Sequence, residues 1–411
     1  MDILLVADGR SPTTRRWLNS LLSSGYQVGL ISSFPCQPLP GLAKMAVIPV
    51  AFSQFAGVVP AQTGPNVGQA FSLSGPVGLK NIVGRFRGVF LAGRYWLGPL
   101  SVQYYAGQAR RIVEEWQPTL VHALRIPFEG MLASFVPPDI PLVVSIWGND
   151  LTLHAGGSAW MGRLTVQCLH RAAGLMADAR RDLRLAGLWG FDPAKPRLAV
   201  PGSGGIDLAE INAIHTDASL LEELALPAGS PLVINPRGFR PGSVRNDTFF
   251  QSIPRVLAQC PEAIFACPAM AGQAEAQRWV QRLDIAAAVR LLPVLPQRQL
   301  WMLFKQAAAC VSPSAHDGTP NTLLESMACG CFPIAGDIES LREWITPGVN
   351  GLLVDPADPA SLAAATLQAI TSPSLRQRAA EINAGIIASR ADASQIRTQI
   401  TAFYRSFGLP N

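Results

Sequence analysis

Short apolar runs alternate with helix-length amphipathic patterns along most of the chain, and this alternation constrains the fold most strongly. The chain opens with the apolar run Ile3–Ala7, a polar loop, and a helical pattern from Trp17 to Leu22 that Gly25 ends. A second apolar run, Val28–Ile31, follows. Strand, helix and strand in this order form a β-α-β unit with parallel strands. The opening therefore predicts an α/β fold with a doubly wound sheet.

The same alternation continues through both halves of the chain. Further strand candidates are Leu120–His122, Leu142–Ile146, Leu232–Asn235, Ala263–Ala266, Val289–Leu292, Cys310–Ser312, Phe332–Ala335 and Leu352–Val354. A chain of 411 residues exceeds what one hydrophobic core usually supports. We therefore expect two Rossmann-like domains, residues 1–228 and 229–385, with a linker near Leu226–Ser230. The last helical segment, residues 386–411, is expected to cross back onto the first domain.

Basic residues gather in the first half. Residues 1–200 hold 18 Lys and Arg against 10 Asp and Glu, a net charge of +8, whereas the remainder holds 15 against 18, a net charge of −3. No acidic residue lies between Gly9 and Val113. This asymmetry indicates that the first domain faces a negatively charged partner.

The stretch from Lys80 to Leu100 alternates basic residues with aromatic and leucine residues. Such a stretch could lie in a bilayer interface, and an insertion that packs on the sheet explains it equally well. Met1-Asp2 leads straight into the first strand without the features of a secretory signal. We therefore expect a cytoplasmic chain with possible peripheral contact to an anionic membrane. Seven scattered cysteines without metal-ligand spacing predict reduced thiols and no metal.

A helix start in the second half predicts an anion site. Thr319 is a good N-cap and Pro320 stands at the favoured first helical position, behind the flexible Asp317-Gly318. The free N–H groups near Asn321 and Thr322, with the positive end of the helix dipole, favour a diphosphate. This segment therefore predicts the binding of a diphosphate.

Two carboxylates bracket this helix start. Asp317 precedes it, and Glu325 lies five residues beyond Pro320. A carboxylate accepts hydrogen bonds from vicinal hydroxyls, so one of these acids can hold a ribose and the other a hexose. The alternative is a plain helix cap with Glu325 exposed on the polar face.

These residues resemble glycosyltransferase family 4. Asp317, seven residues, Glu325, then Ser326–Gly330 and Phe332–Ala335 follow the order of its signature, and Gly348–Pro356 resembles its "G-x-N-G-L-L-V" turn. The resemblance implies the GT-B fold, two domains facing across a cleft. It also implies retaining transfer of a sugar from a nucleoside diphosphate sugar, without a metal cofactor. With this resemblance, we assign Glu325 to the ribose and Asp317 to the transferred sugar.

The resemblance also suggests further site residues. Arg237 matches the arginine after the first strand of the second domain, and Arg245, with Arg240 behind it, is the choice for the second cation on the diphosphate. In the first domain, Gly9 would let the backbone approach the ligand. The acceptor-side candidates are Arg10, His122, Trp147 and Asp150, with Trp147 standing where many members have His.

The acceptor is expected to be a glycan or a lipid-linked intermediate in cell-surface glycan biosynthesis, and nucleic acid is not expected as a partner. Two other hypotheses for the function stay open. A nucleotide-sugar epimerase of the same fold would bind the same donor, and so would a catalytically silent sugar-nucleotide-binding subunit. The basic, acid-free part of the first domain favours the transferase over the epimerase.

Overall fold

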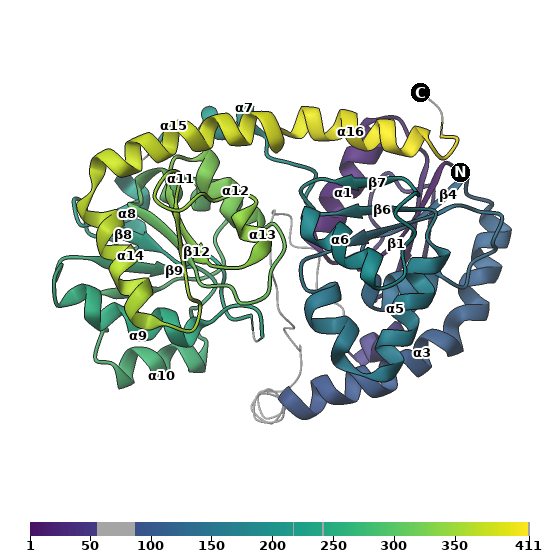
Figure 1. The fold of residues 1–411 in the computed structure, drawn as a ribbon, viewed down its shortest axis with the longest axis horizontal. Helices are drawn as coiled ribbons and strands as arrows, with labels where there is room; N and C mark the ends of the chain where they lie inside the picture. Colours follow the sequence, from purple (N-terminus) through teal and green to yellow (C-terminus); the bar gives the residue numbers. More distant parts are fainter. Residues whose placement is uncertain (56–86, 217, 241, 410–411) are drawn as a thin grey trace. The chain divides into compact units, whose positions relative to one another are not determined.

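The computed structural model describes residues 1–55, 87–216, 218–240 and 242–409. Contacts within the chain divide it into two compact units (Figure 1). Of the described residues, unit 1 contains 1–55, 87–204 and 396–409, and unit 2 contains 205–216, 218–240 and 242–395. Each unit is an α/β structure with its own sheet.

Unit 1 is built on a seven-stranded sheet whose neighbouring strands are all parallel. In spatial order the strands are β3 (Lys44–Val47), β2 (Val28–Ser32), β1 (Ile3–Ala7), β4 (Leu120–Ala123), β5 (Leu142–Ile146), β6 (Gly174–Ala177) and β7 (Arg197–Ala199). The described helices are α1 (Pro12–Ser23), α3 (Arg87–Trp116), α4 (Met131–Ala133), α5 (Ala159–Arg171), α6 (Arg180–Leu188) and α16 (Ala393–Arg405). The order is that of a doubly wound sheet, as predicted.

Burial on both faces explains why the central strands of unit 1, such as β1 and β5, are largely apolar. Because successive side chains point to opposite faces, Leu4 and Val6 of β1 join the core beside α3 and α5. Ile3 and Leu5 join the core beside α1 and α16. The sheet is therefore covered by helices on both sides.

Helix α16 packs on unit 1. Ile396, Ile400 and Tyr404 are buried in the same cluster as Trp17 of α1. The Trp17 Nε1–H donates to the Tyr404 hydroxyl at 3.0 Å. The last described helix thus contributes to the core that the first strand and helix begin.

Unit 2 repeats the architecture with a six-stranded parallel sheet. In spatial order its strands are β10 (Val289–Leu291), β9 (Ile264–Cys267), β8 (Leu232–Ile234), β11 (Ala309–Ser312), β12 (Phe332–Gly336) and β13 (Leu352–Val354). The helices described for it are α7 (Leu208–Asn212), α8 (Ala218–Glu223), α9 (Asn246–Leu257), α10 (Ala274–Arg282), α11 (Gln297–Gln306), α12 (Asn321–Ala328), α13 (Glu339–Arg342), α14 (Pro359–Thr371) and α15 (Pro373–Arg390). This strand order changes direction between β8 and β11.

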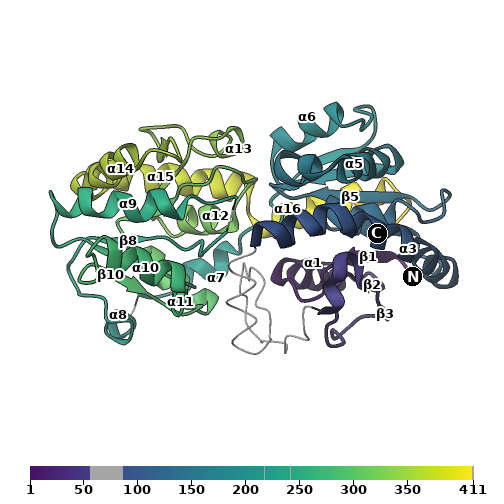
Figure 2. The same cartoon turned by 90° about the horizontal axis from the view of Figure 1, so that it is seen from below.

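Helices cover both faces of the second sheet, with α9 and α14 on one side and α8 and α11 on the other (Figure 2). Val233 of β8 and Phe265 of β9 pack against α9 and α14, whereas Ile234 packs against α11 and α12. No helix within the described ranges is long and apolar enough to cross a bilayer.

The boundary between the units lies at Gly204–Gly205 rather than near the predicted linker at Leu226–Ser230. Residues 206–228, which the sequence predicts as the segment leading from the first domain to the linker, contribute Ile211 and Leu226 to a core cluster of unit 2. Of the predicted basic and aromatic stretch, residues 80–86 lie outside the described residues.

Candidate functional site

Two loops of unit 2 meet where its strand order changes direction. One follows β8 and the other follows β11, and these strands are neighbours in the sheet. The carboxyl ends of parallel strands on either side of such a switch point border a ligand crevice in doubly wound folds. Asn235 shapes the first loop, since its Oδ1 accepts from Arg237 N at 3.3 Å and its Nδ2 donates to Asn246 Oδ1 at 3.2 Å.

Arg237 and Asp317, both predicted site residues, form an ion pair across these loops. Arg237 is only 5% exposed. Its Nη2 pairs with Asp317, and its Nη1 donates to Thr322 Oγ1 at 3.4 Å. Ser314 Oγ donates to the same Asp317 oxygen at 3.1 Å, and Gly318 N donates to the other at 3.1 Å. The structure therefore brings a cation, a carboxylate and the start of α12 together.

The two candidates for the second cation lie in different surroundings. Arg245 pairs with Asp247 at 2.7 Å, and both side chains are more than a third exposed. Arg240 is half-buried, and its side chain forms no hydrogen bond or ion pair with the described residues. The positive charge of Arg237, together with burial, lowers the pKa of Arg240 to about 9, against the opposing effect of Asp317. Arg240, the second choice from the sequence, is thus the cation beside Arg237.

Helix α12 begins at Asn321, one residue later than predicted, with Pro320 at the N-cap position. The predicted capping role of Thr319 is wrong. Its hydroxyl instead accepts a hydrogen bond from the Trp344 indole at 2.9 Å, and Pro320, which has no polar side chain, takes the cap position. The N–H groups of the first helical turn lack earlier carbonyl partners within the helix, which leaves a position suited to an anion.

Glu325 lies on α12 and is 1% exposed. The alternative in which it sits on the exposed polar face of the helix is therefore wrong. Its Oε2 accepts a hydrogen bond from Gln297 Nε2 at 2.9 Å. Gln297 begins α11, and the sequence analysis missed it because nothing in the linear sequence connects it to Glu325.

In unit 1, the loop after β1 is tightly packed. Gly9 N donates to Ser32 Oγ at 3.1 Å, and a Cβ on Gly9 would lie 2.6 Å from Cys36 Sγ. The packing of these neighbours therefore explains why residue 9 is a glycine, without any contact to a ligand. Arg10 pairs with Asp8 at 3.0 Å and stacks on the Phe34 ring at 3.6 Å, so its side chain is engaged within the unit.

Asp150 is fully buried and holds three partners. It accepts from the backbone N–H groups of Ile126 and Trp147, at 3.0 and 3.2 Å, and from Arg125 Nη2 at 2.9 Å. Burial raises the pKa of this carboxyl, and the charge of Arg125 opposes the rise. Asp150 therefore positions Arg125, and its hydrogen bonds with Ile126, Trp147 and Arg125 occupy the carboxylate that was predicted to contact an acceptor. Arg125, one third exposed and missed by the sequence analysis, is the group that reaches solvent.

His122 is also wrong as an acceptor-side residue. It is fully buried, with Nδ1 2.6 Å from the Tyr404 hydroxyl and Nε2 2.9 Å from Ser145 Oγ. Burial lowers its pKa to about 3, so the ring is neutral at physiological pH. His122 belongs to the core of unit 1.

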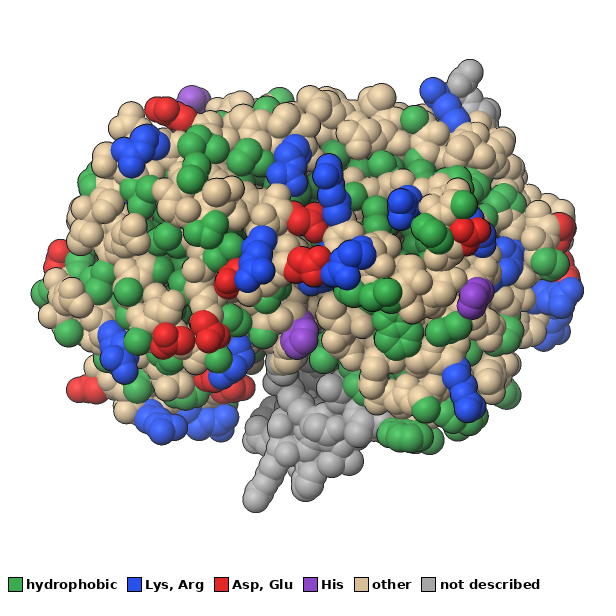
Figure 3. Space-filling model, in the orientation of Figure 1, with side chains coloured by type: hydrophobic (Ala, Val, Ile, Leu, Met, Phe, Trp, Pro, Cys, Tyr) green, Lys and Arg blue, Asp and Glu red, His purple; other side chains and the backbone are tan. Residues whose placement is uncertain are grey.

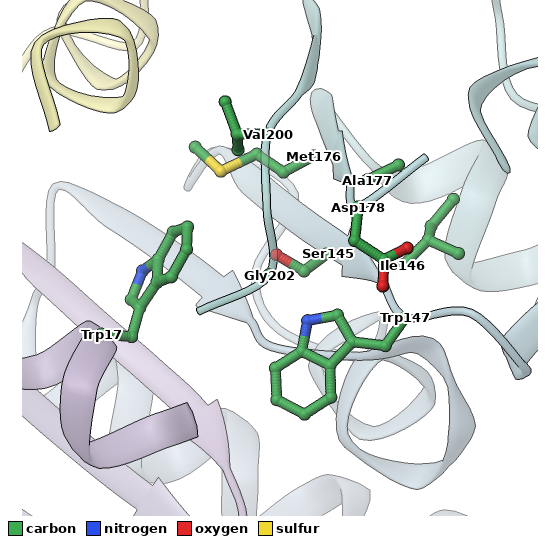
Figure 4. Close-up of a pocket in the computed structure, with 9 residues that line it drawn as sticks. All are labelled: Trp17, Ser145, Ile146, Trp147, Met176, Ala177, Asp178, Val200 and Gly202. Carbon is green, nitrogen blue, oxygen red and sulfur yellow. The ribbon is translucent and has the colours of Figure 1, made fainter. Parts of the chain in front are cut away.

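Trp147 lines a small pocket at the carboxyl ends of β5 and β6 (Figure 4). The lining residues are Trp17, Ser145, Ile146, Trp147, Met176, Ala177, Asp178, Val200 and Gly202. The Trp147 indole lies beside Asp178 and Gly202, where many family members would carry a smaller imidazole (Figure 4). Among the acceptor-side candidates, Trp147 therefore lines a pocket of unit 1.

Solved structures share this architecture. The sucrose-phosphate synthase of Thermosynechococcus elongatus aligns with a TM-score of 0.72 over 99% of both chains, at 15% identity. Anabaena HepE in complex with UDP aligns with a TM-score of 0.67 over 99% of this chain and 100% of that chain, at 17% identity. With its two parallel sheets, the chain has the GT-B fold.

Within this fold, residues 266–384 match the family described as Glycosyl transferases group 1. The matched segment contains Asp317, Glu325 and all of α12. A D-inositol 3-phosphate glycosyltransferase of Thermobispora bispora is 36% identical over 105 residues, 26% of this chain and 24% of that protein. One of Thermomonospora curvata is 25% identical over 306 residues, 70% of this chain and 64% of that protein. The chain spans less than two thirds of both relatives.

Proposed function

We propose that this protein is a retaining glycosyltransferase that moves a sugar from a nucleoside diphosphate sugar to an acceptor hydroxyl. The observation that carries the proposal is the Arg237–Asp317 pair beside the start of α12, inside unit 2. It lies at a strand-order switch point, and most of this constellation falls within the group 1 segment.

The charges of this site suit a diphosphate. Arg237 and Arg240 bring two guanidinium groups close to one carboxylate, Asp317, and repel each other. An anion between them would relieve this repulsion, and guanidinium pairs with phosphate oxygens bidentately. Anabaena HepE, which shares the fold, has been solved with UDP and with UDP-glucose, and this supports the choice of donor.

The proposed reaction retains the configuration at the anomeric carbon. The acceptor oxygen forms its bond to that carbon on the face from which the diphosphate departs, and a donor phosphate oxygen takes the acceptor proton. The carbon–phosphate oxygen bond breaks, and the nucleoside diphosphate leaves with its charge stabilised by Arg237, Arg240 and the first amides of α12. Asp317 orients the transferred sugar and Glu325 the ribose.

For the acceptor, we propose a glycan or a lipid-linked intermediate of cell-surface glycan biosynthesis. The basic first half of the sequence supports a negatively charged acceptor or its anionic surroundings. Trp147, half-buried at the edge of the small pocket of unit 1, stays the proposed acceptor-side aromatic residue.

A screen of nucleotide sugars by thermal shift, followed by a donor-consumption assay, tests the proposal. We expect one nucleotide sugar to raise the melting temperature, because a ligand bound to the folded state alone stabilises it. Asp317→Ala and Glu325→Ala should then slow donor consumption by about 100-fold. The matched control is Asp337→Ala, which removes a partly exposed carboxylate that pairs with Arg342 in the same unit.

Unchanged donor consumption in both site variants would reject this site assignment. Conversion of the donor into its epimer without any acceptor would favour the epimerase. Donor binding without turnover, across a panel of acceptors, would favour the silent subunit.

A further inference from the structure

A buried glutamine contacts one of the two acids of the candidate donor site. Gln297 is 5% exposed at the first position of α11, although glutamine is a residue that proteins seldom bury. Its Nε2 donates to Glu325 Oε2 at 2.9 Å, and Glu325 is itself 1% exposed. Burying an amide without a hydrogen bond is unfavourable, so the contact with Glu325 offsets that cost. Through this pair, α11 contributes to the part of α12 that carries Glu325.

Helix α11 gives Gln297 a fixed position. Leu303 and Phe304 of this helix are fully buried in a core cluster of unit 2. Towards the other end of the helix, Lys305 Nζ donates to the Ile214 carbonyl at 2.8 Å. A polar group orients its neighbour well when its own element is held by packing. The Gln297 amide can therefore fix the direction of a carboxylate on the adjacent helix.

Exposed acids of unit 2 lie in different surroundings. Figure 3 shows acidic and basic side chains interspersed at the lower left, where α9 and α10 lie, and α10 carries Glu275, Arg278 and Arg282 at exposed positions. Water solvates such a carboxylate in many orientations, and a surface ion pair fixes it only weakly. Glu325 offers a ligand very little surface, so the orientation of its carboxylate decides whether a hydroxyl can reach it.

Two thiols near Glu325 stay neutral. Burial raises the pKa of the Cys310 thiol and of the Cys329 thiol to about 12, and the charge of Glu325 adds to both rises. The charge of Arg237 opposes the rise at Cys310, and the charge of Lys305 opposes it at Cys329. Neither thiol changes its charge between pH 5.5 and pH 8, so an acid introduced beside Glu325 can be titrated in that range without them.

We propose that Gln297 is a positioning residue that orients the Glu325 carboxylate toward the ribose, and that the site thereby selects ribonucleotides over 2′-deoxyribonucleotides. The amide N–H fixes one oxygen of Glu325, so the vicinal hydroxyls of a ribose meet a carboxylate of defined direction. A 2′-deoxyribose lacks one of these hydroxyls, and the missing hydrogen bond weakens binding. The inference rests on the assignment of Glu325 to the ribose in the proposed function.

Titration calorimetry with nucleoside diphosphates tests this role. The uridine, guanosine and adenosine diphosphates are screened first, and the tightest binder is then compared with its 2′-deoxy form. The parent chain should prefer the ribose form by about tenfold or more. Gln297→Met keeps the length of the side chain but removes the amide, and should reduce this preference to about threefold or less. Gln306→Met is the matched control and should keep the parent's preference, because the Gln306 amide lies on the same helix and donates to the Met302 carbonyl at 3.2 Å.

Gln297→Glu provides a second measurement. This variant places two acids where an amide and a carboxylate now lie 2.9 Å apart, and two carboxylates at such a distance share a proton or repel each other. Relative to the parent chain at the same pH, binding of the ribose form should fall by about tenfold at pH 8. It should recover by at least about threefold at pH 5.5, where a shared proton restores a donor between the acids. Gln297→Met should show no such recovery.

The outcomes separate the role of Gln297 from the proposed function. An unchanged preference for ribose in Gln297→Met, without recovery of Gln297→Glu at pH 5.5, would overturn the positioning role and leave the proposed function intact. If the parent chain bound none of the three diphosphates, the proposed function would fail and this inference with it. A folding defect does not imitate the expected result, because the preference is a ratio of two affinities of one sample and the recovery requires a folded chain.

Discussion

The loops that follow the strands hold their charges differently in the two units. In unit 1 two arginines of these loops each have their own carboxylate, since Arg10 pairs with Asp8 at 3.0 Å and Arg125 with Asp150 at 2.9 Å. In unit 2, Arg237 pairs with Asp317, and Arg240 lies beside this pair without a carboxylate of its own among the described residues.

This difference distinguishes arginines whose charge is neutralised within the fold from arginines whose charge can still attract an anionic ligand. An arginine with a dedicated acid gives little attraction to an added anion, because the field of the pair is short-ranged. Two arginines that share one acid keep a positive charge that an anion can neutralise. The excess of basic residues in the first half of the sequence therefore does not indicate where a diphosphate binds. The charges of Arg237, Arg240 and Asp317 in unit 2 support the site that we propose.

The largest expected effect is on the stability of unit 1. Asp150→Ala should lower the free energy of unfolding by about 3 kcal/mol, because it leaves Arg125 without its partner and two buried N–H groups without an acceptor. Urea unfolding followed by tryptophan fluorescence measures this loss. Arg10→Ala, which removes a more exposed pair, should cost at most about 1 kcal/mol. If both variants lost the same free energy of unfolding, the inferred difference between the buried Asp150 pair and the more exposed Arg10 pair would be wrong.

Arg237→Ala should reduce kcat/KM for the donor by about 100-fold, because it removes a buried cation from the leaving diphosphate. Steady-state kinetics with the donor found in the thermal-shift screen provide the measurement. Arg10→Ala supplies the control from the other unit and should remain within about threefold of the parent enzyme. If the two arginine variants lost activity equally, the contrast between the units would fail.

Arg240 and Arg245 give a sharper comparison within unit 2. Arg240→Ala should weaken nucleoside diphosphate binding by about tenfold, and Arg245→Ala by at most about twofold, because Arg245 already has Asp247. Binding to the parent chain should also weaken above about pH 9, where Arg240, with its pKa lowered to about 9, loses its charge. Titration calorimetry at pH 7.5 and pH 9.5 measures both effects. If Arg245→Ala lost more affinity for the diphosphate than Arg240→Ala, Arg245 would be the second cation of the site.

A smaller effect concerns His122. Its folded pKa of about 3 lies below the ordinary value of 6.5, so the unfolded chain takes up the proton first and stability falls as the pH drops below about 6.5. At pH 5.5 this histidine should cost about 1 kcal/mol relative to pH 8. In His122→Gln this part of the pH dependence should disappear, as urea midpoints at the two pH values would show. An identical pH dependence in both proteins would contradict the burial of His122.

The sheets were predictable because ten of their strands are mostly apolar runs, in which Arg290 of β10 and His122 of β4 are exceptions. The strands β3, β6 and β7 escaped prediction for a local reason. Lys44–Val47 and Arg197–Ala199 begin with a charge, and Gly174–Ala177 has no β-branched or aromatic residue, so packing against neighbouring strands decides their structure.

The candidate site was predictable where residues that lie close in the sequence also lie close in the structure, as Asp317 and the start of α12 do. It was not predictable where the partner comes from another element. Thr319 receives the Trp344 indole from 25 residues away, and His122 is enclosed by Tyr404 from 282 residues away. The choice between Arg240 and Arg245 likewise depends on which of them the adjacent acid at Asp247 already neutralises.

Titration calorimetry with nucleoside diphosphates most directly tests the central claim that the strand-end loops of unit 2 bind the donor diphosphate. We predict that one of the uridine, guanosine and adenosine diphosphates binds the parent chain and Arg10→Ala with the same affinity. The double variant Arg237→Ala/Arg240→Ala should bind it at least about 100-fold more weakly. Equal affinity in the double variant, or its loss in Arg10→Ala, would contradict the account.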